Sequence, residues 1–128
     1  MKLVKTIAVL CAAMSLLTVS TYAASYSNGA FFSKYFTSNQ VRIVNSGTKN
    51  TNRGYCGGNI NNSLPASLYM VAADTSNVSL SEWISIIKKD DPTMIPFENA
   101  PAKGTKYRIR AVNKNSKEET YKGNAYLN

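Results

Sequence analysis

Residues 103–127 read KGTKYRIRAVNKNSKEETYKGNAYL, and this stretch decides what kind of fold the chain can adopt. Two runs of alternating apolar and polar residues, 106–112 and 120–127, flank a polar segment rich in Asn, Lys and Ser. Alternation of this kind is typical of β-strands, and a polar segment between two such runs is typical of a β-hairpin. The sequence therefore predicts a C-terminal β-hairpin.

The predicted hairpin has an apolar face and a basic face, because side chains along a strand point alternately to its two sides. Tyr107, Ile109 and Ala111 share the apolar face. The basic face carries Lys106, Arg108 and Arg110, and pairing of the two strands adds Lys122 to it. Residues 103–128 hold seven Lys and Arg against two Glu, a net charge of +5. Like charges across a sheet are mildly destabilising. We interpret this face as an anion-binding surface; the alternative is a solvated face that resists aggregation.

The rest of the chain predicts further short strands separated by turns. Apolar or aromatic runs occur at residues 30–36, 40–45, 55–59 and 67–73, and a shorter one lies at 93–98. Short strands at this spacing, with turn residues between them, favour a sandwich or barrel. We predict an all-β fold, an antiparallel β-sandwich of about seven strands in one domain spanning residues 24–128.

Residues 80–89 are ambiguous between a helix and a strand. Ser79 and Glu82 match a capping box, and Leu80, Trp83 and Ile87 fall on one helical face. The same segment contains Trp, Ile and Ser, which strands also accept. The expectation is therefore a sandwich that has either one short helix at 80–89 or a further strand there.

The first 23 residues have the features of a secretory signal peptide. Lys2 and Lys5 precede an apolar run at 7–19, which is too short to span a bilayer comfortably. Small residues at Thr21 and Ala23 suit cleavage before Ala24. The remaining residues carry 13 Lys and Arg and seven acids, a net charge of +6. We expect a secreted, basic, extracellular protein.

The chain contains no histidine, and Cys56 is the only cysteine after residue 23. Without histidine, Ser-His-Asp and Cys-His catalysis cannot be built, and one cysteine cannot make a structural zinc site. We expect no enzyme activity, no metal and no cofactor. Flanking glycines suggest that Cys56 is an accessible thiol able to link a homodimer; the alternative is a small buried residue on a strand.

The pattern of residues 104–113, GTKYRIRAVN, resembles the penultimate strand of fibronectin type III-like sandwiches. The broader layout resembles the small secreted β-sandwich proteins of Gram-positive bacteria that have no assigned function. The shared features are the signal peptide, the Asn/Gly-rich first half, the apolar middle strand and the Arg-Ala-x-Asn strand. This resemblance implies export and a sandwich, and it implies no catalytic residues.

Taken together, these observations lead us to expect a secreted, non-enzymatic binding protein. Its basic hairpin would contact an anionic cell-surface polymer, a polysaccharide or a membrane surface, and nucleic acid is not expected as a partner. The alternative is a secreted antimicrobial or toxin-like protein that acts on the envelope of other cells. That alternative rests on the size, charge and export of the chain alone.

The signal peptide gives the first testable prediction. Material secreted by the native host should begin at Ala24, because the −3 and −1 residues before it are small. N-terminal sequencing or intact-mass measurement of that material checks this, and a mass that retains Met1 contradicts it. Replacing Ala23 with a bulky residue should slow processing, and replacing Ser25 should not.

Overall fold

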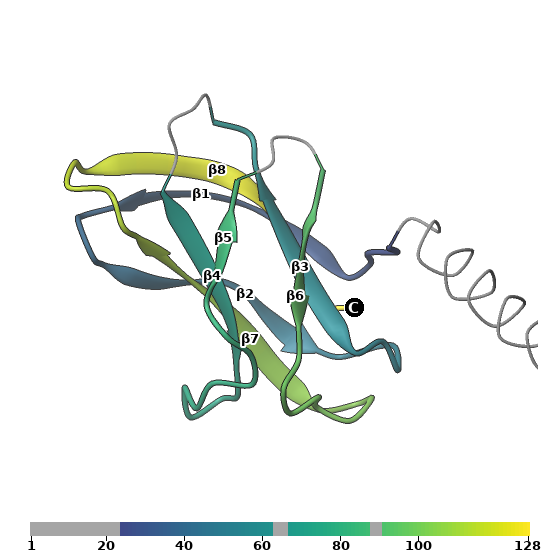
Figure 1. Cartoon of the computed structure of the whole chain (residues 1–128). Helices are drawn as coiled ribbons and strands as arrows, with labels where there is room; N and C mark the ends of the chain where they lie inside the picture. The colour runs from purple at the N-terminus through teal and green to yellow at the C-terminus, as the bar shows by residue number, and fades with distance from the viewer. Residues whose placement is uncertain (1–23, 63–66, 88–90) are drawn as a thin grey trace, which may run out of the picture.

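The computed structural model describes residues 24–62, 67–87 and 91–128, which form two four-stranded antiparallel sheets packed face to face (Figure 1). The strands in chain order are β1 (Gly29–Phe36), β2 (Val41–Thr48), β3 (Tyr55–Ile60), β4 (Leu68–Ala73), β5 (Ile84–Ile86), β6 (Thr93–Pro96), β7 (Lys106–Asn113) and β8 (Glu119–Tyr126). Sheet A has the order β1-β8-β3-β6, and sheet B has the order β2-β7-β4-β5. The predicted all-β sandwich is confirmed, with eight strands rather than about seven.

The signal peptide predicted at 1–23 lies outside the described residues. Within the described ranges, no helix is long and apolar enough to cross a membrane.

The core lies between the two sheets and is built by alternation along each strand. Tyr107, Ile109 and Ala111 of β7 face inward and are fully buried, as the sequence predicted. Phe36 and Tyr121 reach the same core from sheet A, and their ring centroids lie 5.7 Å apart in an edge-to-face contact. Contacts of this geometry stabilise a core beyond the burial of area alone.

The C-terminal hairpin is the main error of the sequence analysis. β7 pairs with β2 and β4 in sheet B, whereas β8 pairs with β1 and β3 in sheet A. The segment between the two strands therefore crosses from one sheet to the other. In Figure 1 this connection lies at the left end of the molecule, and it leads into the yellow β8 beside β1. Two strands that pair in one sheet and two strands that face each other across the core have the same alternation of inward apolar residues. The sequence pattern therefore does not distinguish a hairpin from a crossing between sheets.

Asn113 holds this crossing and is fully buried. Its Nδ2 donates to the Lys117 carbonyl at 2.9 Å, within the connection. Its Oδ1 accepts hydrogen bonds from the Tyr121 hydroxyl at 3.0 Å and from the Asn115 backbone N–H at 2.9 Å. The Asn113 carbonyl accepts a further bond, at 2.7 Å, from the N–H of Asn39 in the β1–β2 turn. One amide thus joins the end of β7, the crossing and β8.

The segment at 80–89 contains a strand, so of the two alternatives left open by the sequence the strand holds for its described part and the helix does not. β5 covers Ile84–Ile86 and pairs with β4, placing Ile86 opposite Leu68. Ile86 is fully buried, whereas Ile87 is 60% exposed. This alternation with period two suits the edge of a sheet and leaves no helical face to bury. Pro96 ends β6, which is an edge strand of sheet A, a position where a proline removes no ladder hydrogen bond from a central strand.

Glycine in β3 is explained by what packs on it. A Cβ at Gly57 would lie 2.3 Å from the Tyr26 ring, and one at Gly58 would lie 2.4 Å from the Met70 sulfur. Large side chains thus occupy the space that side chains of β3 would otherwise fill. The Asn/Gly-rich region can form a central strand for this reason, although glycine alone weakens strands.

The crossing at Asn113 gives a prediction about stability. Asn113→Ala should lower the free energy of unfolding by about 2–3 kcal/mol, because it leaves buried partners unsatisfied. Asn62→Ala is the matched control, since Asn62 also bonds the β8 backbone at Lys122 and Thr120, but through hydrogen bonds that are exposed to solvent. It should cost less than about 1 kcal/mol. Urea unfolding measures both, and equal losses would contradict the role assigned to Asn113.

Candidate anion-binding site

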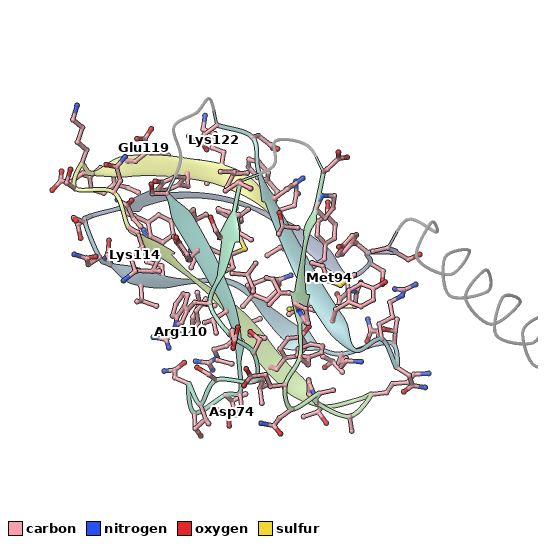
Figure 2. All side chains as sticks on the ribbon, in the orientation of Figure 1. Asp74, Met94, Arg110, Lys114, Glu119 and Lys122 are labelled. Atoms are coloured by element: carbon pink, nitrogen blue, oxygen red, sulfur yellow. The ribbon has the colours of Figure 1, made fainter. Side chains whose placement is uncertain are left out.

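The structure divides the four predicted anion-binding residues between two opposite faces. Lys106, Arg108 and Arg110 lie on the outer face of sheet B, where successive outward residues of one strand are about 7 Å apart. Lys122 lies on the outer face of sheet A, where it pairs with Ser33. Figure 2 shows Lys122 on β8 at the top and Arg110 well below it. The predicted strip that joined Lys122 to the two arginines does not exist.

Arg110 has other cationic neighbours. It lines a hollow at the edge of the sandwich where β1 and β2 lie, together with Lys34 of β1 and Arg42 of β2. The complete lining is Lys34, Gln40, Val41, Arg42, Ile43, Asn77 and Arg110. It contains three cations, two side-chain amides and no carboxylate.

Lys34 and Arg42 reach this hollow from positions that alternation assigns to the interior. Lys34 lies between the inward-facing Phe32 and Phe36, and Arg42 pairs with the buried Ala111. Both are half-buried because β1 and β2 are edge strands at the same side of the sandwich. Long basic side chains can bury their stems there and keep the charged group in water.

The Arg42 guanidinium is held in place by two contacts. Its Nη1 donates to the Tyr35 carbonyl at 2.8 Å, and its central carbon lies 5.9 Å from the centre of the Phe36 ring. A guanidinium has five N–H donors in a fixed plane, so donors remain for a ligand. Positioning a cation in advance lowers the entropy lost when an anion binds.

The turn after β4 contributes Asn77 to the lining of the hollow. The Asp74 carboxylate accepts hydrogen bonds from the N–H groups of Ser76 and Val78, at 2.8 and 2.9 Å, which shapes the turn. Asn77 adopts a left-handed conformation with φ 65° at its tip. Its Oδ1 accepts a bond from Arg108 Nη1 at 3.2 Å, so Arg108 is tied to this turn beside the hollow.

The sequence analysis missed Lys34, Arg42, Gln40 and Asn77. A signal was present for the first two: each is a charge at an inward position of a predicted strand. Charges at such positions indicate an edge strand or a functional site. No local signal brings Asn77 to them, because its position depends on how sheet B is assembled.

Cys56 is buried at the centre of the molecule, so the expectation of an accessible thiol is wrong and the buried alternative holds. It lies on β3 opposite Ile95 of β6, and both residues are fully buried. Burial raises the pKa of the Cys56 thiol to about 12, and a hydrogen bond with Tyr107 offsets only part of this effect. The flanking glycines that suggested exposure are covered by Tyr26 and Met70.

The described residues contain no group of three or more His, Cys, Asp or Glu able to hold a metal ion. Comparison with protein-family models, with curated proteins and with solved structures finds no match to this chain.

The burial of Cys56 gives a prediction about its chemistry. In the native protein the thiol should resist a water-soluble disulfide reagent at pH 8, because it is protonated and shielded from solvent. In denaturant it should react at the rate of an ordinary thiol. Non-reducing gels of folded protein after air oxidation should show monomer. Rapid labelling of the native thiol would contradict the structure.

Proposed function

We propose that this chain is an exported, non-enzymatic binding protein that takes anionic groups of a cell surface at the hollow lined by Lys34, Arg42 and Arg110. The observation that carries the proposal is the convergence of three cations from three strands on one hollow whose lining holds no carboxylate. Like charges held close together repel, and a bound anion relieves that repulsion.

The donor chemistry of the hollow suits oxyanions. Arginine presents paired N–H groups that match the oxygens of phosphate and carboxylate, and charge-assisted bonds of this kind are about twice as strong as neutral ones. The amides of Gln40 and Asn77 supply neutral donors at the rim. Lys34 adds a mobile point charge that can follow the anion.

The polar lining of the hollow favours an anionic group presented on a surface over an enclosed small molecule. Sites for small molecules are deep and mainly apolar, whereas most of this lining is polar. The net charge of +6 carried by residues 24–128 also favours attraction to polyanions. Phosphate or carboxylate groups repeated along a polymer or a membrane fit both features.

The test removes two charges from the hollow and two from elsewhere. Lys34→Gln/Arg110→Gln should weaken binding of soluble polyphosphate in dilute buffer by roughly tenfold or more, because each nearby cation contributes on the order of 1 kcal/mol. The side chains of Lys34 and Arg110 make no hydrogen bond within the described residues, so the fold should be unaffected. Binding by the parent should fall steeply at several hundred millimolar salt, where screening is strong.

Lys103→Gln/Lys122→Gln is the matched control, since it removes the same charge from two exposed sites outside the lining. Its affinity should fall much less than that of Lys34→Gln/Arg110→Gln, because neither lysine lines the hollow. Equal weakening of the two double variants would mean that net charge alone binds. An unchanged Lys34→Gln/Arg110→Gln variant would exclude the hollow.

A further inference from the structure

The outer face of sheet B combines the cations with exposed apolar side chains. Val41 and Ile43 line the same hollow as Arg110 and are 38% and 40% exposed. On β2 they point outward, and Ile43 pairs directly with Arg110. Two β-branched side chains thus stand in water beside the cations of the hollow.

The opposite edge of the same sheet is also apolar. Ile84 and Ile86 of β5 face inward, so alternation places their neighbours Trp83 and Ile87 outward. Trp83 is 39% exposed and Ile87 is 60% exposed. Val78, next to Asn77 in the turn after β4, is 60% exposed. Among the described residues, five of the eight exposed large hydrophobic side chains therefore belong to sheet B and its flanking segments.

The arrangement across the sheet is apolar, cationic, apolar. Val41 and Ile43 lie on one edge strand, the arginines lie on the central β7, and Trp83 and Ile87 flank the other edge strand. Four strands at their usual spacing make this face about 15 Å wide. A soluble phosphate polymer would satisfy the cations and leave the apolar side chains in water. An anionic bilayer satisfies both, because its phosphates lie directly above apolar carbon.

We infer that the outer face of sheet B docks on the surface of an anionic lipid bilayer. The arginines and Lys34 lie at the level of the phosphates, and Val41, Ile43 and Trp83 enter the boundary between headgroups and acyl chains. Tryptophan favours this boundary, and cations near it strengthen attachment. This inference rests on the proposed anion-binding function and names the surface that the hollow recognises.

Trp83 is the chain's only tryptophan, so it reports on docking without a label. With vesicles of phosphatidylglycerol and phosphatidylcholine in a 3:7 ratio, its emission should shift to the blue as its ring leaves water. Lipids with brominated acyl chains should quench it. Polyphosphate should bind without either effect. Binding to the vesicles without a blue shift or quenching would overturn the inference, and this readout needs no variant.

Trp83→Thr/Ile87→Thr separates the inference from the proposed function, because neither side chain lines the hollow. Both side chains are exposed and threonine is accepted in strands, so the fold should survive. Affinity for the anionic vesicles should fall at least about fivefold, because apolar carbon no longer enters the membrane. Affinity for polyphosphate should stay within about twofold. Phe31→Thr/Met94→Thr removes two exposed apolar side chains from sheet A and should change neither affinity.

The outcomes are distinct. If Trp83→Thr/Ile87→Thr binds anionic vesicles as tightly as the parent, or if the parent binds polyphosphate but not vesicles, lipid docking is wrong and anion binding stands. If Lys34→Gln/Arg110→Gln binds polyphosphate as tightly as the parent, the proposed function itself fails. Binding of the parent to pure phosphatidylcholine with equal affinity would also overturn the inference, since charge would then play no part.

Discussion

The buried amide of Asn113 is the interaction on which the arrangement of the two sheets depends. A polar group costs free energy in a core unless its hydrogen bonds are made, and here both the donor and the acceptor side are used. These bonds stabilise one conformation of the chain as it leaves β7 for β8. The same residue contacts the β1–β2 turn through its backbone. Four strands, two from each sheet, therefore meet at this point, and three of them carry Lys34, Arg42 and Arg110.

The strands were predictable because alternation is a local property. Each of the runs at 30–36, 40–45, 55–59 and 67–73 contains or overlaps a real strand, and so do the two C-terminal runs. The partner of each strand is not local. Tyr107 and Tyr121 face inward whether their strands pair or face each other across the core. The feature that separates these topologies is a buried asparagine at a strand end, which reads in the sequence as an ordinary turn residue.

The assumed pairing of β7 with β8 explains which of the predicted anion-binding residues were placed correctly and which were not. Arg108 and Arg110 were placed on the correct face of the correct strand, since that needs only the alternation of β7. Lys122 was assigned to them by the assumed hairpin and instead lies on the opposite sheet. Lys34 and Arg42 were overlooked because the apolar residues of their strands were used to identify the strands, and the charged residues between them were not considered. Cys56 was judged from its glycine neighbours, although burial depends on what packs over those glycines, namely Tyr26 and Met70.

Edge protection is the structural explanation that competes with anion binding for these charges. Inward-pointing cations and β-bulges keep edge strands from pairing with other chains. Lys34 and Arg42 fit that role, as does the irregularity between Ile43 and Asn45 in β2. Arg110 does not, because β7 lies between β2 and β4 and has no free edge. Edge protection also does not explain Val41 and Ile43, which are exposed apolar side chains on the edge strand β2. Such side chains promote association with other chains, which is the opposite of edge protection. An anionic membrane at this face accounts for the central arginine and for the apolar edge together, and for that reason we prefer it.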